Sequence, residues 1–77
     1  MKIKDAKEYY ELGVLIGFDA VRDPMAPGWL LVVSGREGRS WTLETALGGS
    51  KVYSTLDSLV VEIERITGRV TSLHVGL

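Results

Sequence analysis

The sequence contains no cysteine, which excludes disulfides, thiolate metal sites and cysteine nucleophiles. A chain without disulfides suits a reducing compartment, so we expect a cytoplasmic protein. It has a single histidine, His74, and therefore lacks the histidine cluster that many zinc sites use. The longest apolar runs, residues 30–33 and 59–61, are far too short to span a bilayer, and we expect no membrane partner.

An excess of one charge sign is also missing. Nine Lys/Arg residues stand against ten Asp/Glu residues, for a net charge of −1. This balance argues against a strong nucleic-acid binder, which usually carries a basic excess. The 77 residues leave room for one domain, 1–77, and a chain of this size buries only about 60% of its unfolded surface. Small domains often gain stability by oligomerising, so size alone suggests a homodimer.

Two helices are predicted from their capping residues and apolar spacing. Asp5 and Glu8 fit a capping box for a helix over residues 6–12, with Gly13 as its left-handed terminator. Ser54 and Asp57 fit a second box. The helix after it carries an apolar stripe at helical spacing and ends at Gly68. The stripe consists of Leu56, Leu59, Val60, Ile63 and Ile66.

Strands are predicted over residues 14–22, 29–34, 39–47, 51–53 and 69–75. In the first of them, Ile16, Phe18 and Ala20 share one side. Together these elements predict an α+β fold of two layers, an antiparallel sheet of four to five strands with two helices. Their order is helix, three or four strands, helix, strand.

Two registers are possible for the hairpin around residues 35–38. A two-residue loop pairs Val32 with Trp41, whereas a three-residue loop ending in left-handed Gly38 pairs Val33 with Trp41. The second register suits a type I turn with a bulge, and it separates apolar from polar residues more cleanly, so we prefer it. Its apolar face, expected under the second helix, contains Trp29, Leu31, Val33, Trp41 and Leu43.

No catalytic or metal-binding constellation is recognisable, and we expect neither an enzyme nor a cofactor. The acidic residues are scattered, and Glu62 and Glu64, two apart on a helix, are expected to be solvated. His74 is expected to be a structural or surface residue without a nucleophile to activate. Hairpin turns account for the glycines at 35, 38, 48 and 49, and core packing accounts for both tryptophans better than base stacking does.

Two groups of residues are candidates for binding. Val21, Leu30 and Val32, with Val52 as a further candidate, make the second face of the sheet more apolar than a free surface requires. Either the first helix covers this face or another chain does, and the sequence leaves both alternatives open. The other group is basic, is expected near one end of the sheet, and predicts possible nucleic-acid contacts. It consists of Arg22, Arg36, Arg39 and Lys51, offset by Glu37 and Glu44.

Several short motifs carry a family resemblance over residues 9–68. They are Tyr9-Tyr10-Glu11-Leu12-Gly13, Met25-Ala26-Pro27-Gly28-Trp29, Leu43-Glu44-Thr45-Ala46, Val52-Tyr53-Ser54-Thr55-Leu56-Asp57 and Ile66-Thr67-Gly68. In this layout the chain resembles small ParC-type partition-associated proteins of bacterial plasmids and mobile elements. It departs from them at Gly48-Gly49 and in the C-terminal strand. The resemblance implies a non-enzymatic accessory role in partition or maintenance in the bacterial cytoplasm, through self-association or protein contact, and brings no catalytic residues. A small nucleic-acid-binding regulator is the alternative.

Overall fold

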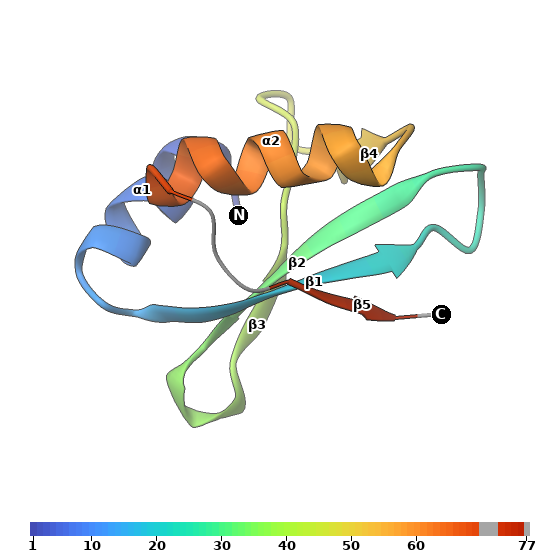
Figure 1. Cartoon of the computed structure of the whole chain (residues 1–77). Coiled ribbons are helices and arrows are strands. Elements are labelled where there is room, and N and C mark those ends of the chain that lie inside the picture. Colours follow the sequence, from blue (N-terminus) through green and yellow to red (C-terminus); the bar gives the residue numbers. More distant parts are fainter. Residues whose placement is uncertain (70–72, 77) are drawn as a thin grey trace.

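The structure is a computed structural model that describes residues 1–69 and 73–76. Two helices lie on one face of a five-stranded sheet, which confirms the predicted two-layer α+β fold (Figure 1). The elements are α1 (Ile3–Glu11), β1 (Leu15–Arg22), β2 (Trp29–Gly35), a short turn of 3-10 helix (Arg36–Gly38), β3 (Ser40–Thr42), β4 (Val52–Tyr53), α2 (Leu56–Thr67) and β5 (His74–Gly76).

The sheet has the strand order β3-β2-β1-β5, and β4 pairs with β2 along the same edge as β3. Strands β1 to β4 are antiparallel neighbours as predicted, but β5 lies parallel to β1, so the sheet is mixed. The reason is α2, which carries the chain back along the sheet before the last strand (Figure 1). A helical crossover of this kind is what parallel strands require. The strand expected over residues 69–75 falls partly on residues 70–72, which lie outside the described residues.

The β2–β3 hairpin has the preferred register. Val33 pairs with Trp41, and Gly38 has a positive φ of 75° in a loop of three residues. Glu37 also has a positive φ of 65°, so the turn is not the expected type I turn with a bulge. A Cβ at Gly35 would lie 2.8 Å from Cζ3 of Trp41. Glycine at this position therefore lets the indole ring lie against the backbone of β2.

The predicted strand over residues 39–47 is interrupted. Strand β3 ends at Thr42, and the chain then turns outward, with the amide of Thr45 donating to the carbonyl of Gly49. It returns as β4, which pairs with the other half of β2. The turn predicted at Gly48-Gly49 is thus present, but it lies in a loop that projects from the edge of the sheet between β3 and β4.

Strand β1 contains a bulge that changes which residues face the helices. Leu15 pairs with Gly35 while Gly17 pairs with Ser34, so Ile16 is the extra residue. Leu15 and Phe18 are buried as a result, and Ile16 is 63% exposed. The prediction that Ile16 shares a face with Phe18 and Ala20 is therefore wrong.

Both helices end where predicted, but neither begins at the predicted cap. Gly13 and Gly68 have left-handed φ values of 76° and 75°. Helix α1 begins at Ile3, since Lys2 pairs with Glu44 in a β-bridge and the chain turns into the helix directly after it. Asp5 therefore lies in the first turn and is not the cap. In α2 the cap is Thr55, whose hydroxyl accepts the Ser58 amide at 3.1 Å, one residue after the expected Ser54.

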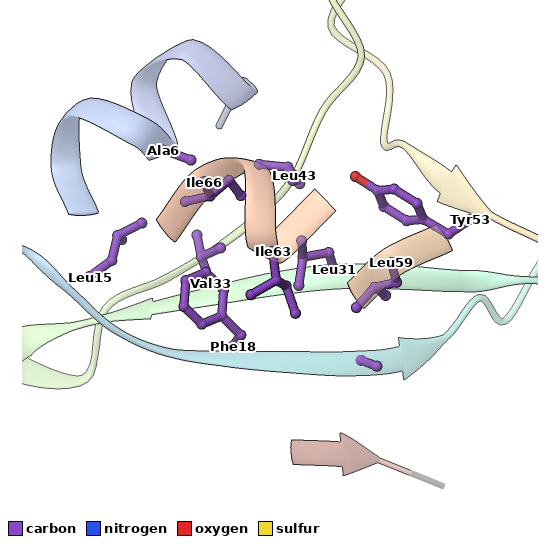
Figure 2. Close-up of a cluster of buried hydrophobic side chains, with 11 residues drawn as sticks. Ala6, Leu15, Phe18, Leu31, Val33, Leu43, Tyr53, Leu59, Ile63 and Ile66 are labelled. Atoms are coloured by element: carbon purple, nitrogen blue, oxygen red, sulfur yellow. The ribbon is translucent and has the colours of Figure 1, made fainter. Parts of the chain in front are cut away.

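The core fills the space between the two helices and one face of the sheet (Figure 2). Helix α1 contributes Ala6, and α2 contributes Leu59, Ile63 and Ile66. The buried set from the rest of the chain consists of Leu15, Phe18, Ala20, Leu31, Val33, Leu43 and Tyr53. Trp29 and Trp41 are half-buried against this cluster, which confirms core packing for both tryptophans.

Candidate interaction surface

The face of the sheet that points away from the helices carries a continuous apolar strip. Residues that pair directly across strands point to the same side of a sheet. Val21 pairs with Leu30, and Leu30 pairs with Val52, so these three side chains form a row across β1, β2 and β4. Val32 lies two residues further along β2 on the same side. We call these four residues the outer strip.

Neither helix covers the outer strip. Both α1 and α2 lie on the opposite side of the sheet, and Ala6 of α1 belongs to the core beside Ile66 (Figures 1 and 2). Val21 is 39% exposed and Val52 is 44% exposed, while Leu30 and Val32 are half-buried. Of the two alternatives left open by the sequence, covering by the first helix is therefore wrong. Within residues 1–69 and 73–76, no secondary-structure element packs on this face.

A small polar cluster adjoins the outer strip on the same face. Asp19 pairs with Val32 on one side and with His74 on the other. One Asp19 oxygen lies 3.3 Å from Nδ1 of His74, and the other accepts a 3.3 Å hydrogen bond from the Ser34 hydroxyl. A hydrolytic triad needs the imidazole between serine and carboxylate, but here the carboxylate is central. This cluster therefore lacks the geometry that would activate Ser34 as a nucleophile.

The four basic residues predicted as nucleic-acid contacts do not share one end of the sheet. Arg22 closes β1 at one end, with its guanidinium 4.9 Å from the centre of the Trp29 ring. Arg36 and Arg39 lie at the opposite end, around the β2–β3 turn. The expected location is wrong because Arg22 pairs with Trp29, the first residue of β2, whereas Arg36 follows its last. Only Arg36 and Arg39 are brought together.

The fourth basic residue, Lys51, belongs to a partly buried ionic cluster that the sequence analysis missed. Glu62 on α2 is 2% exposed, so the expectation that it is solvated is wrong. One of its oxygens accepts hydrogen bonds from Lys51 Nζ at 2.6 Å and from the Tyr53 hydroxyl at 3.0 Å. The other oxygen has no hydrogen-bond partner among the described residues, and the Arg65 guanidinium lies 3.8 Å from it.

A signal for this burial was present in the sequence. Leu59, Glu62, Ile63 and Ile66 follow the i, i+3, i+4, i+7 spacing of a buried helix face. Glu62 therefore lies within the apolar stripe, and a carboxylate there needs a partner. The spacing of Glu62 and Glu64 on the helix does not show which of them is buried. Burial depends on the position of each residue relative to the apolar stripe, and Glu64, which is exposed, lies outside it.

The ionic cluster changes the acidity of Tyr53. Burial, followed by the hydrogen bond to Glu62 and the charge of that carboxylate, raises the pKa of Tyr53 far above its usual value. A phenol with a raised pKa stays neutral at physiological pH and acts as a hydrogen-bond donor to Glu62. A pocket of about 320 Å³ adjoins the cluster and is also lined by Ser58 and Val61.

The raised pKa gives a pH-dependent prediction. Above about pH 10 the unfolded chain loses the Tyr53 proton while the folded chain keeps it, so this contribution to stability falls as pH rises. We expect Tyr53→Phe to be less stable than the wild type at pH 7, with a difference that shrinks above about pH 10. Urea unfolding across this pH range measures it. A Tyr9→Phe variant, altered at an exposed phenol, is the matched control. A difference that grew with pH would contradict the prediction.

Comparisons with protein-family models, with curated proteins and with solved structures found no match to this chain. The described residues contain no cluster of three or more His, Asp or Glu side chains able to hold a metal ion. Nor does this part of the chain contain a helix with the length and apolar character needed to cross a membrane.

Proposed function

We propose that this protein is a non-enzymatic interaction module that associates with a second copy of itself through the outer strip. The observation that carries the proposal is the apolar row of Val21, Leu30 and Val52, which both helices leave uncovered. A contiguous apolar surface of this kind is typical of an interaction site. Its residues are regularly spaced on three neighbouring strands, which favours a flat, sheet-like partner.

A second copy of the chain suits this face in shape and in charge. Two outer faces can pack as the layers of a β-sandwich, about 10 Å apart, with side chains interdigitating. The polar cluster carries one carboxylate, Asp19, and one imidazole, His74. In a two-fold arrangement each face meets an identical face, so the Asp19 of one copy can approach the His74 of the other. A small domain also gains stability from burying this surface, since its own core is limited.

For the biological role we propose an accessory factor in partition or maintenance of a bacterial plasmid or mobile element, acting in the cytoplasm. The support is the resemblance of the turn and cap motifs over residues 9–68. Gene neighbourhood tests this part separately: partition or replication genes beside the gene support it, and a neighbourhood without them argues against it.

A lysine in the outer strip should abolish self-association. We expect the wild type to sediment as a dimer and Leu30→Lys to sediment as a monomer, because a charge would be buried in the apolar centre of the interface. The control is Val61→Lys on the exposed side of α2, where the wild-type side chain is 47% exposed. Sedimentation velocity over a concentration series measures both.

Two results would count against the proposal. A wild type that remains monomeric at the highest concentrations shows that the outer strip does not bind a second copy. An equal loss of dimer in Leu30→Lys and Val61→Lys places the interface elsewhere. Thermal unfolding of each variant separates loss of association from loss of folding.

The alternative function, a small nucleic-acid-binding regulator, has one supporting observation. Arg36 and Arg39 are both exposed; Arg36 begins the three-residue turn Arg36–Gly38, and Arg39 directly follows it. Arg22 and Lys51 no longer add to this site, because they lie elsewhere and contact Trp29 and Glu62. Anisotropy of a labelled oligonucleotide against salt tests it, since phosphate contacts give an affinity that falls steeply with salt.

A further inference from the structure

A second feature, separate from the outer strip, is a cleft at the end of the molecule where both helices terminate. The C-terminal ends of α1 and α2 lie on the same side, at the left in Figure 1, beside the start of β1. The cleft between them has a volume of about 610 Å³. This is within the range of about 300–1,000 Å³ that is typical of small-molecule sites.

Positive charge is concentrated around this cleft. Four of the nine basic residues of the chain line it, against a single acid, Glu11. The four are Lys7, Arg36, Arg65 and Arg69, and we call this cleft the basic cleft. Among the described residues, no carboxylate oxygen lies within 4.0 Å of the charged groups of Lys7, Arg36 or Arg69. These three cations are therefore not neutralised by ion pairs within the described part of the chain.

Two of the guanidinium groups are held in place by neutral partners. Nε of Arg36 donates to the carbonyl of Gly13 at 3.3 Å, and one terminal nitrogen of Arg69 donates to the Tyr10 hydroxyl at 2.9 Å. Each bond uses one of the five N–H donors of an arginine and leaves four for other acceptors. The backbone around Arg69 is fixed as well, because its amide donates to the Thr67 hydroxyl at 3.2 Å. The donors are thus oriented before any ligand arrives.

Stabilisation of the helix ends explains only part of this charge. Each helix C-terminus carries a partial charge of about −0.5, and cations beside it are favourable. The two helix ends and Glu11 together offset about two of the four positive charges. Glu62 lies 3.8 Å from Arg65 but is already paired with Lys51 at 2.6 Å, so an excess of about two remains. An excess of this size, on exposed and oriented arginines, suits a multiply charged anion.

We propose that the basic cleft binds a small ligand through a phosphate or pyrophosphate group. Arginine forks match phosphate oxygens, and several cations converging from different elements favour an anion with more than one charge. The gathering of these cations around one cleft and the net charge of −1 for the whole chain favour a compact ligand over a long nucleic acid. The Tyr10 hydroxyl, which accepts from Arg69, keeps its own proton free to donate to a phosphate oxygen.

Calorimetric titration of the full chain with inorganic pyrophosphate, with ATP and with a single-stranded oligonucleotide tests this proposal. We expect pyrophosphate and ATP to bind, with an affinity that falls between about 50 and about 200 mM salt. Arg36→Gln combined with Arg69→Gln should weaken binding by at least about tenfold. Arg22→Gln, at the far end of the sheet, is the matched control and should change the affinity by less than about twofold.

Lys7→Gln is a second variant that does not depend on the folding of the double variant. Lys7 is exposed on α1, and we expect its loss to weaken ATP binding by about threefold or more. Amide chemical shifts should move most at Gly13, Gly68 and Arg69 when pyrophosphate is added. No heat and no shift changes with pyrophosphate or ATP would overturn the proposal. So would equal loss of affinity in Arg22→Gln, or oligonucleotide binding that far exceeds ATP binding.

Discussion

Replacing Lys51 by methionine is expected to destabilise the protein by about 3 kcal/mol. Lys51 Nζ lies 2.6 Å from Glu62, whose side chain is 2% exposed, so the substitution leaves a buried carboxylate without its closest cation. The expected loss lies at the low end of the range for breaking a buried ion pair, because the Lys51 side chain is about one-third exposed (34%). Chemical denaturation at pH 7 measures the change.

The double variant Lys51→Met with Glu62→Met separates this explanation from a simple loss of packing. With both charges removed, no uncompensated ion remains, and we expect most of the lost stability to return. Arg65→Met is the matched control, because its guanidinium lies 3.8 Å from Glu62 and its side chain is 66% exposed. We expect it to change stability by less than about 1 kcal/mol. A double variant as unstable as Lys51→Met alone would show that Lys51 acts through its aliphatic contacts and not through Glu62.

The parts of the fold that local chemistry determines were predictable from the sequence. Gly38 fixed the hairpin loop at three residues, and the alternation of Trp41 and Leu43 with polar neighbours in the following strand fixed its register. Gly13 and Gly68 marked both helix ends. The helix starts were less certain, because Ser54 and Thr55 are both good N-cap residues, and Asp57, three positions after Ser54, favoured the wrong one.

Contacts between distant segments were not predictable in the same way. The parallel pairing of β5 with β1 joins Asp19 to His74, which lie far apart in the chain. The bulge at Ile16 depends on how β1 meets β2 and leaves no mark in the alternation of β1 itself. The basic cleft combines residues from α1, α2 and the β2–β3 turn, of which only Arg36 was singled out as a candidate. Its other cations, Lys7, Arg65 and Arg69, come together only because both helices end on the same side of the fold.

Leu30→Ala and Leu31→Ala, neighbouring substitutions of the same residue type, should differ strongly in how far they destabilise the fold. Leu31 is fully buried under α2, and we expect its truncation to destabilise the fold by about 3 to 4 kcal/mol. A domain of 77 residues has a total stability of only about 4–12 kcal/mol, so a substantial unfolded fraction is expected near physiological temperature. Leu30 lies on the outer strip and is half-buried, so its truncation should destabilise the monomer by about 1 kcal/mol.

Self-association should be affected in the reverse order, and Leu31→Val replaces Leu31→Ala in this comparison because the alanine variant is expected to unfold. Leu30→Ala removes a central side chain of the outer strip and should weaken dimerisation while leaving the fold intact. Leu31→Val, a milder truncation that keeps the chain folded, leaves the outer strip unchanged and should dimerise like the wild type. Denaturation at low protein concentration measures the first property, and sedimentation at high concentration measures the second. Equal weakening of dimerisation by Leu31→Val and Leu30→Ala would contradict the assignment of the inner face of the sheet to the core and of the outer strip to self-association.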